Sequence, residues 1–390
     1  MQNNSLHSSY NPLKEAERFL ASLNVQGEKV FILVEPGENY LYEILHKSYP
    51  LSKIITLHAD PVYHKGKENE WSLNNHEQIT LQSFLEHSIP DMAASDIRLI
   101  EWLPALKVYS TEILSITETT VQYIKRIDAN YRTEKAFSKR WEANRKRNLP
   151  FCNAVNKSSL ANYYNNPNGL IVCAAGPQLE LALPDIQKLH EKEGIALLAV
   201  SSALPFLVQQ SIYPEIILTT DGGFWANLHM AELYREIAHA KAQRCKEEKG
   251  ARHLFCPLLV ATLHATIPTQ VLEMAAGEGC LAFADLPMRG TVAASALDLA
   301  MQFTDGSIYI AGFSFENEDI KTHCSPYAFE SYIRKGCNRL KPYYSEMYTR
   351  TEAINAGNSL SVYAEWFASH LGLYQGRIVS LPGNNALFSK

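Results

Sequence analysis

The chain has 390 residues, which at roughly 100–200 residues per domain predicts two or three domains and excludes a single small module. Its composition, 46% hydrophobic, 10% aromatic and 20% charged, is that of a globular protein and excludes a disordered or fibrous one. Lys and Arg number 36 against 41 Asp and Glu, and this formal charge of -5 argues against a dedicated nucleic-acid binder.

The cysteines and the apolar segments indicate the compartment. The seven cysteines are an odd number, contain no CxxC pair and lie mostly in apolar runs, as buried thiols do in a reducing compartment. The N-terminus lacks the basic and apolar regions of a signal peptide, and no apolar segment reaches the roughly 18–20 residues that span a bilayer. We therefore expect a soluble, cytoplasmic protein without a membrane span.

The first 105 residues alternate between helical and strand patterns. Apolar residues recur at helical spacing in two stretches, and three short apolar runs are typical of buried strands. In chain order these are a helix at 13–23, a strand at 29–35, a helix at 38–49 and strands at 53–58 and 97–102. Residues 1–105 are therefore predicted to form a small α/β domain of their own.

A helical connector is predicted at residues 106–150. No strand pattern occurs there, and residues 134–148 are rich in helix formers. Five cations stand close together in that stretch, namely Lys139, Arg140, Arg145, Lys146 and Arg147. They are either a site for an anionic partner or the solvated face of a helix, and charge runs on helices are more often the latter.

Residues 151–320 show regular alternation of short apolar runs with helical patterns. The runs predict strands at 169–175, 196–200, 215–219, 258–263, 280–284 and 307–312, with a helix at 292–303 before the last. This pattern predicts a central Rossmann-like, mostly parallel sheet with helices on both faces. Residues 321–390 are predicted to form a mainly helical C-terminal region, with a possible strand at 377–381. The predicted fold class is thus α/β.

Ligands of open α/β sheets bind beyond the carboxyl ends of the strands, so the residues that follow each strand are the first candidates. After the strand at 169–175, Ala175, Gly176, Pro177 and Gln178 form a glycine turn that opens a helix, where backbone N–H groups can face a nucleotide phosphate. The turn lacks both the GxGxxG fingerprint and the P-loop pattern, which weakens ordinary dinucleotide and P-loop nucleotide binding. A plain strand-to-helix turn is the alternative.

A second candidate follows the strand at 215–219. Asp221 is a possible catalytic residue that can bind a ribose hydroxyl or a metal-bound phosphate, and Gly222 admits a close ligand. Asp221 can equally cap the next helix. As a metal ligand it needs substrate oxygens to complete the coordination of Mg²⁺.

Two further candidates complete the set. Gly290 and Thr291 precede the helix at 292–303, where they form either an anion-friendly helix start or a simple cap. Gly312 and Ser314 follow the strand at 307–312 and lead to His323, and an imidazole is the natural general base near neutral pH.

These segments resemble a known family in their order and spacing. GLIVCAAGPQLE (169–180), GTVAASALDLAMQF (290–303) and IYIAGFSFENEDIKTHC (308–324) are similar to the motility accessory factor family, whose shared domain is also described as like 6-hydroxymethylpterin diphosphokinase. The same core looks like the bacterial sialyltransferase fold.

The resemblance implies a glycosyltransferase. It places a CMP-activated nonulosonic acid by the turn at 176–179, makes His323 the base, and suggests flagellin as the protein acceptor. The domain name implies a rival reaction, pyrophosphoryl transfer from ATP with Mg²⁺, for which Asp221 would need help from Asp285, Glu316 or Asp319.

The chain departs from the family pattern at three positions. Ala175 stands where a polar residue is usual, Gln178 where a serine is usual, and Ser314 where an aspartate is expected. Either Glu316 or Asp319 substitutes for that carboxylate, or activity is altered or absent. The third interpretation is therefore a non-catalytic nucleotide-binding or flagellar assembly protein.

Overall fold

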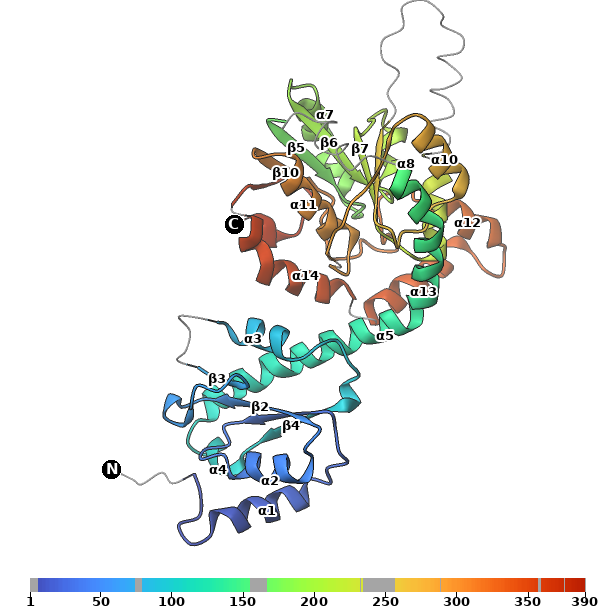
Figure 1. Ribbon diagram of the computed structural model, residues 1–390. Coiled ribbons are helices and arrows are strands. Elements are labelled where there is room, and N and C mark those ends of the chain that lie inside the picture. Colours follow the sequence, from blue (N-terminus) through green and yellow to red (C-terminus); the bar gives the residue numbers. More distant parts are fainter. Residues whose placement is uncertain are drawn as a thin grey trace, which may run out of the picture. The chain divides into compact units, whose positions relative to one another are not determined.

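The structure is a computed structural model, which describes residues 6–73, 79–154, 167–231, 233, 257–287, 289–356, 359–374 and 376–389. The chain divides into two compact units, Met1–Ser138 and Lys139–Lys390 (Figure 1). Within the described residues, no helix is both long enough and apolar enough to cross a membrane.

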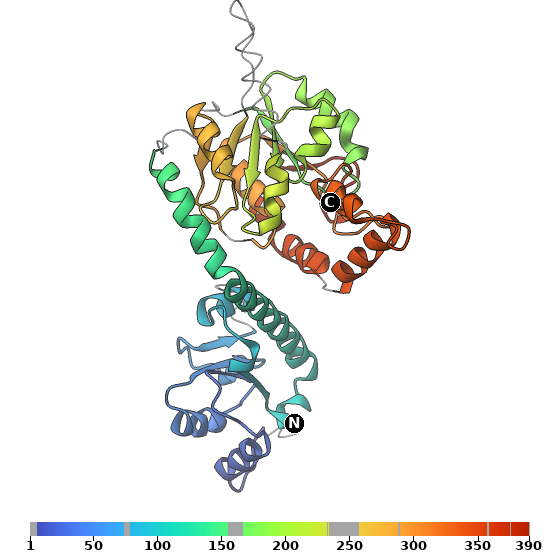
Figure 2. The same ribbon diagram turned by 90° about the vertical axis from the view of Figure 1, so that its right-hand side faces the viewer.

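The first unit contains a four-stranded parallel sheet in the order β3-β2-β1-β4 (Figures 1 and 2). Its strands are β1 (Val30–Val34), β2 (Lys53–His58), β3 (Glu70–Ser72) and β4 (Ile97–Glu101). Its helices are α1 (Pro12–Ser22), α2 (Tyr40–Ser48), α3 (Leu81–Ser88) and α4 (Leu103–Leu106), followed by α5 (Ser110–Ala154), whose residues from 139 belong to the second unit. The small N-terminal α/β fold predicted from the sequence is confirmed.

The second unit contains a seven-stranded parallel sheet in the order β11-β10-β5-β6-β7-β8-β9. Its strands are β5 (Gly169–Cys173), β6 (Ile195–Val200), β7 (Ile216–Thr219), β8 (Leu258–Ala261), β9 (Leu281–Phe283), β10 (Ser307–Ala311) and β11 (Ile378–Ser380). Its helices are α7 (Leu183–His190), α8 (Leu204–Gln209), α10 (Thr269–Gly277), α11 (Val292–Phe303), α12 (Ala328–Gly336), α13 (Tyr343–Ala356) and α14 (Ser359–His370).

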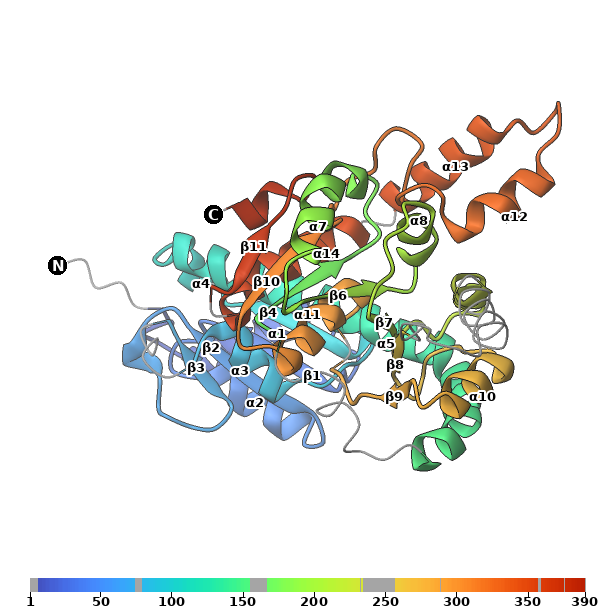
Figure 3. The same cartoon turned by 90° about the horizontal axis from the view of Figure 1, so that it is seen from above.

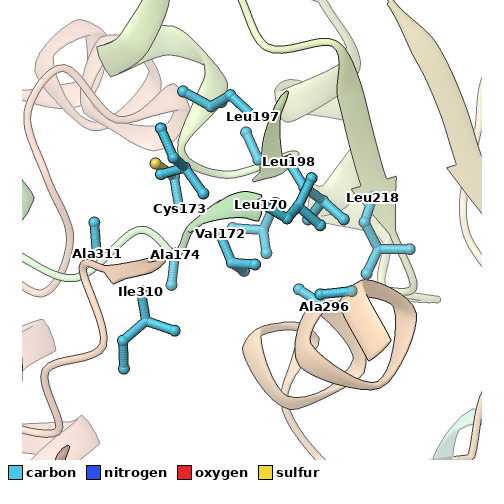
Figure 4. Close-up of a cluster of buried hydrophobic side chains, with 14 of the residues drawn as sticks. Leu170, Val172, Cys173, Ala174, Leu197, Leu198, Leu218, Ala296, Ile310 and Ala311 are labelled. Carbon is cyan, nitrogen blue, oxygen red and sulfur yellow. The ribbon is translucent and has the colours of Figure 1, made fainter. Parts of the chain in front are cut away.

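The strands of the large sheet are buried on both faces. All five residues of β5 are buried, as its continuous apolar sequence predicts for a central parallel strand. Leu170, Val172, Leu198 and Leu218 share one face of the sheet, where Ala296 of α11 packs among them (Figure 4). Burial of each leucine side chain of this kind stabilises the folded state by about 1.5–3 kcal/mol.

Helices cover both faces of this sheet. α7 packs on β5 and β6, whereas α11 packs on β5, β6 and β7. α7 connects β5 to β6, and α11 connects β9 back to β10, so the two connections run along the sheet in opposite directions. Right-handed crossovers therefore place the two helices on opposite faces of the sheet (Figure 3). α12 and α13 pack against each other and, with α14, make the C-terminal region helical. The predicted α/β fold class is confirmed.

Several elements differ from the sequence-based prediction. β3, α3 and α10 were not predicted; two of them are short, and α10 has an evenly apolar sequence with a weak helical period. The helix predicted to follow the glycine turn is divided into a 3-10 turn, Leu179–Ala182, and α7, because Pro184 restarts the helix at its first turn.

Five of the seven cysteines lie among the described residues. Cys173, Cys280 and Cys324 are buried, Cys152 and Cys337 are half-buried, and none of these five forms a disulfide. Burial raises the pKa of the Cys173 thiol to about 12. Cys245 and Cys256 lie outside the described residues.

Candidate functional site

The strand order of the large sheet places a switch point between β5 and β10. From β5 the chain adds β6, β7, β8 and β9 on one side, and it then returns to add β10 and β11 on the other. At such a point neighbouring loops leave the sheet in opposite directions, and a ligand crevice opens at the carboxyl ends of the two strands. Two predicted groups flank this point, namely residues 175–178 after β5 and Gly312 with Ser314 after β10.

Backbone hydrogen bonds hold these two loops together beyond the sheet. The N–H of Ala174 donates to the carbonyl of Ala311 at 2.8 Å, and the N–H of Gly176 donates to that of Gly312 at 2.9 Å. A Cβ on Gly176 would overlap the Gly312 carbonyl oxygen and lie 2.5 Å from the Ser314 Oγ atom. Gly312 has φ +74°, and a Cβ there would overlap the Ala174 carbonyl. Both glycines are therefore required by the close approach of two backbones.

Three polar atoms near the carboxyl edge of the sheet are buried without a hydrogen-bond partner among the described residues. They are the Oγ of Ser314 after β10, the Oγ1 of Thr219 at the end of β7 and the Nε2 of His229 beyond it. Each unpaired buried group costs about 1–3 kcal/mol, which a polar ligand or water can offset. Beside them, Pro177 is buried and Gln178 is half-buried.

His323 is held next to the switch point. The N–H of Cys324 donates to the carbonyl of Ala175 at 3.0 Å and so ties the histidine loop to the turn after β5. The His323 ring stacks on Tyr327, with centroids 4.1 Å apart and planes 8° apart, and its Nδ1 lies 2.9 Å from the Thr322 Oγ1. Burial, aided by the charges of His229 and Arg350, lowers the pKa of His323 to about 3, so its imidazole is neutral at pH 7.

The loop after β7 approaches the same rings. His229 is buried, and its ring centroid lies 5.5 Å from that of Tyr327. Burial lowers the pKa of His229, against the opposing effect of Asp221. The Asp221 carboxylate is exposed and accepts the Gly223 N–H at 2.7 Å, so it closes its own turn. Its negative charge adds to burial in raising the pKa of Tyr327. The charge of Asp221 thus acts on Tyr327, the ring on which His323 stacks.

Gly222 lies against the ring of Trp141, a contact that the sequence did not predict. A Cβ on Gly222 would overlap the Trp141 ring, so the space that was assigned to a ligand is filled by a side chain of α5. Asn144, one turn further along α5, donates from its Nδ2 to the carbonyls of Gly222 at 3.3 Å and His264 at 3.0 Å. Asn148 donates in the same way to the carbonyls of Leu263 and Ala265, each at 2.9 Å. Two asparagines four residues apart within a cationic helix are the signal that could have revealed this contact.

The five cations around these asparagines are exposed, namely Lys139, Arg140, Arg145, Lys146 and Arg147. Glu142 lies 3.9 Å from Arg145 and 3.7 Å from Lys146. These exposed cations fit the solvated helix face that the sequence allowed. The contacts of this helix with the loops after β7 and β8 are made by its two asparagines.

Gly290 and Thr291 stand at the start of α11. The Thr291 Oγ1 accepts the Ala293 N–H at 3.4 Å and caps the helix. Gly290 has φ +78°, and a Cβ there would lie 3.7 Å from Tyr363. Burial raises the pKa of Tyr363, and the charge of Asp221 adds to the effect, which links this helix start to the loop after β7.

A cavity of about 420 Å³ opens beside His323. The loop after β10 and the helices α12 and α13 supply its walls. Its main lining residues are Lys321, Thr322, His323, Tyr327, Phe329, Glu330, Arg334, Tyr343, Met347 and Arg350, together with Glu318 and Asp319. The volume lies within the range of small-molecule sites, about 300–1,000 Å³.

The candidate carboxylates do not gather into a metal site in the described part of the chain. No three His, Cys, Asp or Glu side chains there are placed to hold one ion. Asp319 lines the cavity and accepts the Tyr344 hydroxyl at 3.1 Å, whereas Glu316 and Asp285 are exposed and do not line it. A magnesium ion at Asp221 would therefore depend on substrate oxygens for its other ligands.

Comparison with known proteins finds similarity over the core and over most of the chain. Residues 143–319 match the family model described as 6-hydroxymethylpterin diphosphokinase MptE-like. This confirms the resemblance inferred from the turn after β5 and the loop after β10.

The chain is also similar to an uncharacterised protein of Treponema pallidum (strain Nichols), with 28% identity over 291 residues. That similarity covers 74% of this chain and 61% of the relative, so the chain spans less than two thirds of the relative's length. Among solved structures it is similar to the MAf glycosyltransferase from Magnetospirillum magneticum AMB-1, with 12% identity and a TM-score of 0.43. This similarity covers 78% of the chain and 52% of that structure.

Proposed function

We propose that the MptE-like core is a glycosyltransferase, which moves a sugar from a nucleotide donor to a hydroxyl group of a protein. The observation that carries the proposal is His323, a neutral imidazole that lines the cavity and is tied by Cys324 to the switch-point turn. A base placed at the edge of a ligand crevice is what an acceptor hydroxyl needs in order to attack.

In the proposed step the acceptor oxygen forms a bond to the anomeric carbon of the sugar. The bond from that carbon to the phosphate oxygen breaks, its electron pair leaves with the phosphate, and the hydroxyl proton passes to Nε2 of His323. We assign the imidazole proton to Nδ1, which lies 2.9 Å from the Thr322 Oγ1, and this tautomer leaves Nε2 unprotonated. Dipoles and cations near the phosphate would stabilise the leaving nucleotide.

The finer assignments follow the sequence resemblance. We propose a CMP-linked nonulosonic acid as donor and flagellin as an acceptor. The nucleotide would meet Ala175, Gly176, Pro177 and Gln178 on one side of the switch point and Gly312 and Ser314 on the other, with Gly290 and Thr291 further along the same edge. The unpaired Ser314 hydroxyl supports a polar ligand there. Asp221 would position the donor from the loop after β7.

A second candidate is pyrophosphoryl transfer from ATP to a hydroxymethylpterin, which the description of the family model favours. That reaction depends on Mg²⁺ and on oxygen ligands that converge on it. Carboxylates line the cavity next to His323 beside its imidazole, phenol and guanidinium groups, but within the described part of the chain no three His, Cys, Asp or Glu side chains are placed to hold one ion, and we therefore place sugar transfer first. Loss of catalysis with retention of the fold is the third candidate, suggested by Ala175, Gln178 and Ser314.

A thermal-shift panel separates these candidates. The chain is melted with CMP, CTP, UDP, GDP, GTP and ATP, each with and without Mg²⁺, because a ligand at about 100 times its Kd stabilises the folded state by roughly 2.7 kcal/mol. Stabilisation by CMP without metal supports sugar transfer, and a metal-dependent response to ATP supports the diphosphokinase. A chain that responds to no nucleotide contradicts both enzymatic proposals.

A further inference from the structure

Arg350 is a half-buried cation in the wall of the cavity beside His323. It lies on α13, and its guanidinium carbon is 5.0 Å from the centroid of the Phe329 ring. None of the ion pairs between described residues includes Arg350. An arginine in this position has lost part of its hydration and has no carboxylate partner among the described residues.

Other charges around the cavity have nearer partners. Lys321 lies 3.8 Å from Glu180, and Asp319 accepts the Tyr344 hydroxyl at 3.1 Å. Arg334 stacks over Tyr343 at 4.1 Å, towards the exposed end of α12. Glu318 and Glu330 are acids of the same wall, so the cavity is not uniformly basic. Arg350 is the cation whose charge acts on His323.

Phe329 fixes the orientation of the guanidinium. This ring is 91% buried and lies 5.2 Å from Tyr327 and 5.8 Å from His229, centroid to centroid. A guanidinium held over a buried ring keeps its N–H groups free at its edge, in the fork that matches two oxygens of one anionic group.

We propose that Arg350 binds an oxyanion of the substrate, a phosphate or a carboxylate, within the cavity beside His323. The proposal rests on the proposed function, because it assigns the anionic part of the donor to a named residue. It also connects binding to chemistry. An anion on Arg350 offsets the positive charge that depresses the pKa of His323, so the occupied site has the more basic imidazole.

Calorimetric titration of the full chain tests this assignment with three probes. Sodium pyrophosphate presents phosphate oxygens, N-acetylneuraminic acid presents a carboxylate on a sugar, and its methyl ester is the neutral match. Each probe is titrated into the wild type, Arg350→Gln, Arg350→Lys and Arg339→Gln. Arg339 is exposed between α12 and α13 and does not line the cavity, so Arg339→Gln repeats the change in charge away from the site.

We expect at least one anionic probe to bind the wild type and to lose about tenfold or more in affinity in Arg350→Gln. Arg350→Lys keeps the charge without the fork and should lose less, and Arg339→Gln should bind within about twofold of the wild type. Loss of pyrophosphate binding alone identifies the phosphate, whereas loss of the sugar acid alone, with no binding of its ester, identifies the carboxylate. Melting temperatures of the variants establish that they are folded.

Two results would overturn the assignment. One is equal affinity of folded Arg350→Gln and wild type for every probe that binds, and the other is a wild type that binds none of the probes. Failure of the proposed function would give a different result, namely that no nucleotide stabilises the wild type. A chain can therefore bind pyrophosphate through Arg350 and still not be a glycosyltransferase.

Discussion

The backbone N–H of Gly176 donates to the carbonyl oxygen of Gly312 at 2.9 Å, across the switch point of the large sheet. The two residues are 136 positions apart in the sequence, yet no side chain fits between them. This contact brings the turn after β5 against the loop after β10, and the bond from Cys324 to Ala175 then places His323 at the crevice. The position of the proposed base therefore depends on two glycines that carry no chemistry of their own.

Gly176→Ala should destabilise the second unit. The new methyl group must overlap the Gly312 carbonyl and crowd Ser314, and overpacking of this kind costs about 1–3 kcal/mol. Urea denaturation measures the loss. The control is Gly277→Ala, because that glycine ends α10 with nothing within 4 Å of its new Cβ, and the same mutation there should be neutral or stabilise by up to about 1 kcal/mol. Equal stability of the two variants would refute the close-approach argument.

His323→Ala should lower turnover strongly and spare nucleotide binding. Removal of a general base lowers kcat by about 10²–10⁴-fold, while the nucleotide is expected to contact the turn and not the imidazole. The assay is release of free nucleotide from the donor identified by thermal shift, with binding measured by calorimetry. His46→Ala, an exposed histidine of α2, serves as the control. If His323→Ala lost nucleotide binding as well, its role as base would fail.

Folding stability should fall as the pH drops below about 6.5. Burial, with the charges of His229 and Arg350, holds the pKa of His323 near 3, so between these values the unfolded chain binds a proton that the folded chain does not. One such histidine contributes a slope of up to about 1.4 kcal/mol per pH unit. Urea denaturation at pH 5 and pH 7 measures it, and His323→Gln should flatten the dependence.

His190 gives a contrast of opposite sign. The His190 Nε2 donates to the Glu215 Oε1 at 2.8 Å, and this hydrogen bond raises the pKa of His190 above its ordinary value. Its stabilisation is present below about pH 6.5 and is lost as the pH rises through the higher folded pKa. His190→Gln should therefore make the loss of stability at pH 5 larger. The same flattening in both variants would contradict the assignment of the two histidines.

Asn144→Ala should destabilise the loops after β7 and β8. The substitution leaves the carbonyls of Gly222 and His264 without their buried donor, at a cost of about 1–3 kcal/mol. Arg145→Ala, on the exposed side of the same helix, should change stability by less than about 0.5 kcal/mol. Chemical denaturation of both variants, together with hydrogen exchange of the loop amides, provides the comparison.

The sequence by itself determined the fold class and most of the elements. The apolar run of β5 and the helical spacing of α11 are local patterns, and side-chain alternation or a 3.6-residue period acts over a few residues regardless of what lies elsewhere. Short elements with little pattern escaped, such as β3 at Glu70–Ser72. The sequence also identified the glycines at strand ends as positions of close approach. It did not identify which group approaches each of them.

Only the tertiary structure decided what those glycines meet and which side chains share the cavity. Trp141 fills the space at Gly222, and Arg350 reaches the surroundings of His323 from a helix near the end of the chain. These contacts depend on the order of strands in the sheet and on the return of the chain to β10 beside β5. Such an order is set by packing and loop closure across the whole unit, and local residue preferences carry no record of it.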